Sequence, residues 1–149
     1  MNKKIKFFTF KFSKKNDLGF PFTYINILNK YQFYKSYQIM MEVNNNWAGL
    51  ARLHYLNNKT FELGDFFIIP DLRGKKYKGK KYYQYLMDEV LKKAKIKNKN
   101  IKEITLAVEE NHKPAIHIYS KNGFKIFKNK SIQRFTFPKK KFIYMKLKL

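Results

Sequence analysis

Apolar and polar residues alternate along much of the first half of the chain, and this period of two predicts β-strands. The alternation is partial in residues 3–12 (KKIKFFTFKF), and three further β-rich segments follow at residues 37–43, 47–56 and 60–70. Asparagine-rich stretches separate the last three segments, and asparagine tolerates the positive φ angles of hairpin turns. We therefore expect an antiparallel meander, with a helix over residues 23–34 between its first and second strands.

The spacing of apolar residues becomes helical after residue 81. They recur three and four positions apart, with lysines on the other side: Tyr82, Tyr83, Leu86, Met87, Val90, Leu91 and Ala94. Residues 101–108 (IKEITLAV) are apolar in their centre, which is typical of a buried parallel strand. Strand, loop, helix and strand form a βαβ unit, and its loop lies at the carboxyl edge of the first strand, where open α/β sheets bind ligands.

A short helix is expected over residues 113–120, closed by Gly123, and strands at "FKIF" and "KFIYMKLKL" complete the chain. No repeat or linker divides the 149 residues, and 44% of them are apolar, so we predict a single domain, residues 1–149. The predicted fold class is α/β (α+β), with a mixed, mostly antiparallel central sheet that contains the βαβ unit.

The composition excludes several kinds of site. The chain has no cysteine, and its three histidines lack the spacing of metal ligands, so we expect neither disulfides nor a metal site. No apolar run reaches membrane-spanning length, and the N-terminus lacks the apolar core of a signal peptide. We expect an intracellular, cytoplasmic protein without a membrane partner, as a monomer or a homodimer.

The net charge of +23 raises the question of nucleic-acid binding. Only Arg52, Arg73 and Arg134 are arginine among the 33 basic residues, and lysine is poorly suited to bidentate recognition of bases and phosphates. Lysine, asparagine, isoleucine, phenylalanine and tyrosine are all abundant, as AT-rich codons would give, which accounts for much of the charge without a function. A basic nucleic-acid-binding module without catalysis stays open as an alternative.

The loop before the main helix combines glycine with a high density of cations. It comprises Arg73, Gly74, Lys75, Lys76, Tyr77, Lys78, Gly79 and Lys80. Free amides and the dipole at a helix N-terminus favour an anion there, and glycine lets the backbone approach it closely. The loop therefore predicts an anion site, although it is neither a P-loop nor a dinucleotide fingerprint. An ordinary turn with solvated lysines is the alternative.

Two segments resemble the motifs of a known family. "LGDFFIIPDLRGKKYKG" is similar to the strand–loop–helix signature of the GNAT superfamily of acyl-CoA-dependent N-acetyltransferases, and "VEENHKPAIHIYSKNGF" is similar to its later motif. The resemblance covers residues 37–149. It implies a GNAT-like domain in which residues 65–69 and 104–108 form parallel strands that splay apart around the pantetheine of acetyl-CoA. It also implies transfer of an acetyl group from acetyl-CoA to a primary amine by direct attack.

The resemblance assigns roles to individual residues. Backbone amides of Phe67, Ile68 and Ile69 would pair with pantetheine, and one of them would stabilise the oxyanion. Tyr119 matches the family's general acid for the leaving thiolate, with plain core packing as the alternative. The remaining cofactor-binding residues would be the loop described above, Asn111 and His112.

Carboxylates near the expected thioester supply candidates for the base. Asp65 is our candidate for the catalytic base, and Glu62 and Glu110 are candidates for binding the acceptor amine, with Glu109 beside them. A solvated surface acid is the alternative for each. His112 is a second candidate base, since histidine titrates near neutral pH.

Departures from the family pattern leave alternatives open. The loop has two glycines where the family usually has three, so a catalytically inactive GNAT fold that binds CoA is a third interpretation. "LGDFFIIPDLRG" is similar to the spermidine/spermine acetyltransferase branch, but Gly64 replaces an acidic residue that is common there. A chain of charge +23 would also repel a polyamine. The acceptor, a small molecule or a protein amine, stays open.

Overall fold

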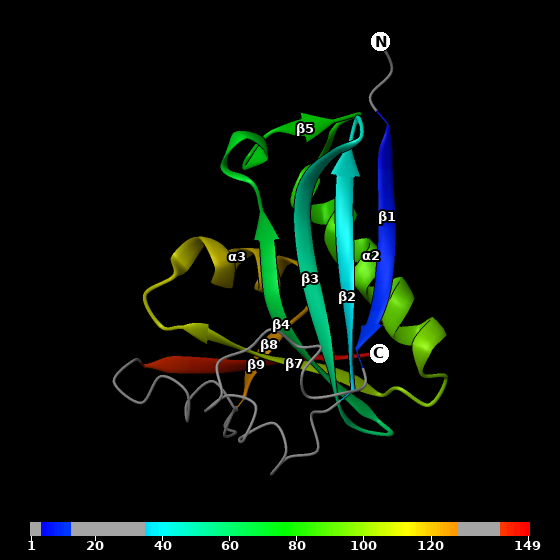
Figure 1. The fold of residues 1–149 in the computed structure, drawn as a ribbon. Coiled ribbons are helices and arrows are strands. Elements are labelled where there is room, and N and C mark those ends of the chain that lie inside the picture. Colours follow the sequence, from blue (N-terminus) through cyan, green and yellow to red (C-terminus); the bar gives the residue numbers. More distant parts are fainter. Residues whose placement is uncertain (1–3, 13–34, 128–140) are drawn as a thin grey trace.

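The computed structural model describes residues 4–12, 35–127 and 141–149, and in these ranges it shows a seven-stranded sheet with helices beside it (Figure 1). The strands follow the order β1-β2-β3-β4-β7-β9-β8 across the sheet. Their bounds are Ile5–Phe12 (β1), Ser36–Val43 (β2), Asn46–Asn57 (β3), Thr60–Ile68 (β4), Glu103–Glu109 (β7), Lys125–Phe127 (β8) and Phe142–Lys148 (β9). The predicted mixed, mostly antiparallel sheet is confirmed. The helix expected over residues 23–34 lies outside the described residues.

One strand pair, β4 with β7, is parallel among the described strands, and it forms a fork. The two strands pair only where Thr60, Phe61 and Glu62 face Glu103, Ile104 and Thr105. Beyond this point β4 continues along β3, whereas β7 continues along β9. Figure 1 shows the two strands diverging after the paired segment. The splayed pair of parallel strands expected from the sequence is thus present.

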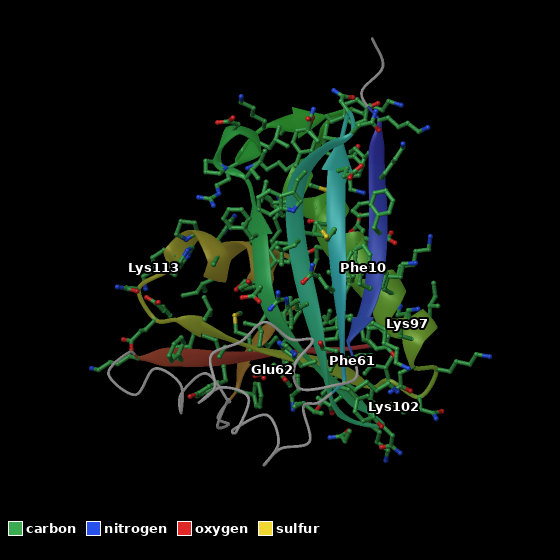
Figure 2. All side chains as sticks on the ribbon, in the orientation of Figure 1. Phe10, Phe61, Glu62, Lys97, Lys102 and Lys113 are labelled. Carbon is green, nitrogen blue, oxygen red and sulfur yellow. The ribbon has the colours of Figure 1, made fainter. Side chains whose placement is uncertain are left out.

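Helix α2, Tyr82–Lys97, packs against the sheet and forms the core with it (Figure 2). Its residues Leu86, Met87 and Val90 are completely buried, as their helical spacing predicts. On β2 every second residue joins the same core, namely Tyr37, Ile39, Met41 and Val43. None of the helices in the described residues is long and apolar enough to cross a membrane.

A small hairpin lies within the lysine-rich loop between β4 and α2, and the sequence analysis did not predict its two strands. After a 3₁₀ turn, Pro70–Leu72 (η2), strands Lys76–Tyr77 (β5) and Lys80–Lys81 (β6) pair with each other. Lys78 and Gly79, at φ 50° and 76°, form the turn between them. The hairpin is fastened to the helix, because the hydroxyl of Tyr85 donates to the carbonyl of Tyr77 at 2.9 Å. The helix therefore begins at Tyr82.

The chain returns from β7 through α3, Lys113–Lys121, to the edge strand β8. The prediction of a helix over residues 113–120 is confirmed. Gly123 ends this helix with a φ of 94°, in the left-handed region that glycine adopts most readily. Helix α3 thus lies beside the open end of the fork, where it forms one wall of the site described next.

Candidate active site

A cleft of about 560 Å³ lies at the open end of the fork. Its walls come from the end of β4, the turn that follows, the first turn of α2 and the first two turns of α3. Five residues predicted to bind the cofactor line it: Phe67, Ile68, Arg73, Gly74 and His112. Leu72, Lys81, Tyr83 and His117 also line it, and the sequence analysis had not assigned them to the site.

At the end of β4, the backbone carbonyl and amide of one residue, Ile68, both point toward the open side of the fork. The amide of Ile69 donates to the carbonyl of Ala48 on β3 at 2.9 Å, so the carbonyl of Ile68, opposite it on the same trans peptide, points away from β3. The carbonyl of Phe67 faces β3, since a Cβ built on Gly49 would lie 2.5 Å from that oxygen. The amide of Ile68 therefore also points away from β3.

Of the three amides predicted to face the cofactor, only that of Ile68 is so oriented. The amide of Ile69 is engaged with β3, and strand alternation directs the amide of Phe67 to the same side. The pairing of β4 with β7 ends at Glu62, so none of the described strands pairs with β4 at Ile68 on its open side. The end of β4 thus offers a single backbone donor to a ligand in the cleft.

The side chain of Arg73, in the turn after β4, contacts the backbone of Ile68. Its Nε donates to the carbonyl of Ile68 at 2.7 Å. Its guanidinium carbon lies 4.8 Å from the centroid of the Phe67 ring, within the range of a cation–π contact. Trp47 stacks on Phe67, with ring centroids 5.8 Å apart and planes 15° apart. Arg73 therefore contacts both the backbone and the side chains of β4.

The first turn of α2 begins beside the cleft. The amide of Tyr82 donates to the carbonyl of Lys75 at 3.3 Å, whereas the next amides, of Tyr83 and Gln84, have no acceptor within the helix. Lys81 and Tyr83 line the cleft here. The cleft lining does not include the hairpin residues predicted to hold the cofactor, which are Lys75, Lys76, Tyr77, Lys78, Gly79 and Lys80. Lys80 instead pairs with Asp88 on α2.

Tyr119 lies on α3 behind the cleft wall. Its ring packs edge-on against Phe66, which lines the cleft, with centroids 6.1 Å apart, and against Phe124, at 5.8 Å. Burial raises the pKa of Tyr119 to about 12, so its hydroxyl keeps its proton across the physiological range. Tyr119 does not itself line the cleft, although Phe66, against which its ring packs, does.

The candidate acids lie outside the cleft lining. Asp65 forms an ion pair with Arg52 at 3.3 Å, and its side chain is half exposed. Glu62 is 6% exposed and occupies the last paired position before the fork, opposite Thr105. Glu110 is exposed just after the end of β7. The structure therefore places one carboxylate, that of Glu62, inside the protein at the base of the fork.

His112 and Asn111 precede α3, and only His112 reaches the cleft. His112 is the N-cap of the helix, and its Nδ1 accepts a hydrogen bond from the amide of Ala115 at 3.1 Å. Asn111 is exposed, and its carbonyl accepts from the amide of Lys113. Within the described residues, no group of three or more histidines and acids is placed to hold a metal ion.

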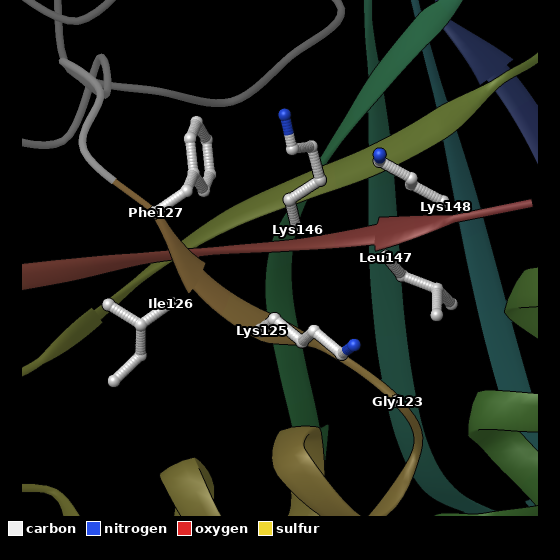
Figure 3. A pocket seen from close by; sticks show the side chains of 7 residues that line it. All are labelled: Gly123, Lys125, Ile126, Phe127, Lys146, Leu147 and Lys148. Carbon is white, nitrogen blue, oxygen red and sulfur yellow. The ribbon is translucent and has the colours of Figure 1, made fainter.

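A second hollow, of about 450 Å³, lies on β8 and β9 at the edge of the sheet (Figure 3). Lys125, Lys146 and Lys148 line it, with Ile126 and Phe127. Lys146 is already engaged, because its Nζ lies 3.5 Å from a carboxylate oxygen of Glu103 and 4.7 Å from the ring centroid of Phe127. None of the residues predicted to be functional lines this hollow.

Solved structures of acetyltransferases share this fold. A GNAT family acetyltransferase from Elizabethkingia anophelis, solved with acetyl-CoA bound, is 18% identical and matches with a TM-score of 0.67 over 99% of each chain. The N-acetyltransferase PseH of Campylobacter jejuni in complex with acetyl coenzyme A is 18% identical, with a TM-score of 0.61 over 96% of this chain and 99% of that one.

The spermidine/spermine N-acetyltransferase SpeG of Vibrio cholerae is also similar, at 17% identity and a TM-score of 0.62 over 97% of this chain and 95% of that one. At these identities the likeness shows the fold and leaves the acceptor unassigned. Comparison with curated proteins finds no significant match. The model of the Acetyltransferase (GNAT) family, however, matches residues 15–124. Together with the forked sheet and its cleft, this match shows that the chain belongs to the GNAT family of acetyltransferases.

Proposed function

We propose that this protein transfers an acetyl group from acetyl-CoA to a primary amine by direct attack of the amine on the thioester. The observation that carries the proposal is the fork between β4 and β7, which leaves the amide of Ile68 facing a cleft of about 560 Å³. Two acetyltransferases of the same fold are described as having acetyl-CoA bound.

We place two parts of acetyl-CoA in this cleft. The pantetheine would enter the fork, where β4 lacks a neighbouring strand. The diphosphate would meet the free amides of Tyr83 and Gln84 at the start of α2, where the helix dipole favours an anion. Lys81, the residue before the helix, adds positive charge there. The hairpin lysines, outside the cleft lining, would act on the anion only through their field.

The chemistry then needs one oxyanion donor, a base for the attacking ammonium and an acid for the leaving thiolate. As the amine nitrogen bonds to the thioester carbon, the amide of Ile68 stabilises the negative charge on the carbonyl oxygen. Collapse of the intermediate breaks the carbon–sulfur bond, and the leaving thiolate takes a proton donated by Tyr119. The second proton that the former amine nitrogen loses then returns Tyr119 to its phenol form. Since Tyr119 keeps its proton up to a pKa of about 12, it is protonated whenever the thiolate forms.

The proton of the attacking ammonium would go to a carboxylate, for which Glu62 is our candidate because it is buried at the base of the fork. Asp65, the candidate base from the sequence, is half exposed and pairs with Arg52 at 3.3 Å, and Glu62 also has a partner in the structure. Glu62 lies at the last pair of β4 and β7, directly below the fork. A buried carboxylate there would take the proton through a water molecule and return it to solvent after the transfer. Asp65 and Arg52 would then line the acceptor side.

Two alternatives make different predictions. A nucleic-acid-binding module requires the cations to gather on one surface, but the exposed Lys97 and Lys113 lie on opposite sides of the molecule in Figure 2. A catalytically inactive fold that binds CoA is motivated by the loop of residues 73–80, which has two glycines where the family usually has three.

The test combines ligand binding with turnover. Acetyl-CoA should raise the thermal midpoint in proportion to its affinity, and free CoA thiol should appear when a panel of primary amines is added. Stabilisation by acetyl-CoA without thiol release would indicate the inactive fold. No stabilisation at millimolar acetyl-CoA would contradict the proposal, and salt-sensitive binding of an oligonucleotide in that case would support the nucleic-acid alternative.

A further inference from the structure

We infer that Arg73 is a positioning residue, whose side chain holds the peptide of Ile68 so that the amide of Ile68 stays directed into the cleft. The inference rests on the proposed function, because that amide is the oxyanion donor of the transfer step. It differs from the role that the sequence suggests for Arg73, in which its charge binds a phosphate of the cofactor.

The first observation is the hydrogen bond itself. The Nε of Arg73 lies 2.7 Å from the carbonyl oxygen of Ile68, at the short end of the range for a bond from a charged donor. That carbonyl is on the edge of β4 that has no neighbouring strand. Arg73 therefore supplies the partner that a strand would have supplied, and it leaves the amide of Ile68, on the same edge, free for a ligand.

The second observation is that the peptide is held from both sides. On the β3 side, the amide of Ile69 donates to the carbonyl of Ala48 at 2.9 Å. On the open side, Arg73 binds the carbonyl of Ile68, which belongs to the same peptide group. Two hydrogen bonds at opposite ends of one planar group fix its rotation about the strand axis. The amide of Ile68, one bond away along the chain, is oriented with it.

The third observation is that the position of Arg73 is itself fixed. Its guanidinium lies over the ring of Phe67, and Trp47 stacks on that ring. Phe67 and Trp47 are 36% and 44% exposed, so they contribute a cation–π contact and a stacking contact at the surface rather than core packing. The 3₁₀ turn restrains the backbone of Arg73, because its amide donates to the carbonyl of Pro70 at 3.2 Å.

The two possible roles of Arg73 respond differently to Arg73→Lys. Lysine keeps the charge that a phosphate needs, but it lacks the Nε donor and the planar group that lies over Phe67. If Arg73 positions the peptide, the variant should bind CoA within twofold of the wild type, whereas its single-turnover rate of acetyl transfer should fall about tenfold. Loss of a whole oxyanion donor costs about 10²–10³ in rate, and a misdirected donor loses part of that.

Two further variants accompany this one. Phe67→Leu removes the ring beneath the guanidinium and keeps an apolar side chain, so we expect a smaller loss of rate, about threefold, again without a change in CoA affinity. Lys92→Gln is the matched control, because it removes one positive charge from an exposed position on α2 outside the cleft lining. Its rate and affinity should equal those of the wild type.

An unchanged single-turnover rate in Arg73→Lys would overturn the inference. A weaker affinity for CoA with an unchanged rate would also overturn it, and would assign Arg73 to the phosphates instead. Failure of the proposed function is distinguishable, because the wild type would then show no transfer to any amine. In that case, hydrogen exchange of the Ile69 amide in the unliganded protein still tests whether Arg73 restrains this peptide. The exchange should be severalfold faster in Arg73→Lys, and an unchanged exchange rate would refute the inference.

Discussion

His112 and Ala115 are joined by a hydrogen bond in which the amide of Ala115 donates to Nδ1 of His112 at 3.1 Å. His112 thereby caps α3, the helix that brings His117 and Ile118 to the cleft and Tyr119 against Phe66. The side chain that the sequence assigned to the cofactor therefore has a role in the fold as well. An N-cap partner satisfies one of the helix's unpaired amides, and its loss weakens the start of the helix.

The cap can be tested by substitution at His112. His112→Ala should lower the free energy of unfolding by about 1 kcal/mol, because alanine leaves the amide of Ala115 without its acceptor. His112→Asn should retain most of the stability, since asparagine is among the preferred N-cap residues. Urea denaturation of the three proteins measures the difference, and equal midpoints for His112→Ala and the wild type would contradict the role as a cap.

Tyr119→Phe should slow acetyl transfer by about 10²-fold, in the range that a general acid contributes, with little change in the affinity for CoA. The ring contacts with Phe66 and Phe124 are kept in this variant, so its fold should be unchanged. Because burial raises the pKa of Tyr119 to about 12, the wild-type pH–rate profile should show no loss from this group below about pH 10. A variant as fast as the wild type would remove Tyr119 from the mechanism.

The same pKa shift predicts a dependence of stability on pH. A tyrosine whose folded pKa, about 12, lies above its unfolded value of about 10 binds its proton more tightly when folded. Its contribution is therefore complete below pH 10 and is lost as the pH rises toward 12. The wild type should lose about 2 kcal/mol more than Tyr119→Phe between these limits, as measured by urea denaturation at each pH. Parallel curves for the two proteins would show that the pKa is not raised.

Gly64→Ala should destabilise the protein by about 1–3 kcal/mol, because a Cβ at this position would lie 2.6 Å from Nε2 of the buried His54. Burial, with a smaller effect of Arg52, lowers the pKa of His54 to about 3, so the ring is neutral at neutral pH. In a double-mutant cycle, His54→Ala should partly relieve the cost of Gly64→Ala. Strict additivity of the two changes would contradict the close approach. An acidic residue, as in the spermidine/spermine branch, would meet the same obstacle.

Substitution of Lys78 in the hairpin turn separates the effect of backbone conformation on stability from the effect of charge on CoA binding. Lys78 has a φ of 50°, which costs a residue with a side chain about 1–2 kcal/mol, so Lys78→Gly should raise the free energy of unfolding by about 0.5 kcal/mol. Gly79→Ala, at φ 76°, should lower it by about 1 kcal/mol. The affinity of Lys78→Gly for CoA should fall no more than threefold, since Lys78 lies outside the cleft lining. A tenfold loss of affinity for CoA, measured by calorimetry, would show that Lys78 contributes to cofactor binding.

The sequence by itself determined the elements, because their signals are local. The periodicity of two around Ile39 and Met41, the helical spacing of Leu86 and Val90, and the glycine at position 123 each depend on residues a few positions apart, and the structure confirms the elements they predict. The family motifs likewise predicted where the two parallel strands separate and which residues lie near the separation.

Only the tertiary structure decided how the backbone groups of those residues are used. Whether an amide on β4 faces β3 or the open cleft depends on strand pairing, which distinguishes Ile68 from Ile69 although both belong to one apolar run. The reach of Arg73 to Ile68 and the burial of Glu62 at the base of the fork arise from contacts that no local pattern encodes. The hairpin before α2 was not predicted, because its turn depends on the positive φ angles of Lys78 and Gly79 and not on a hydrophobic pattern.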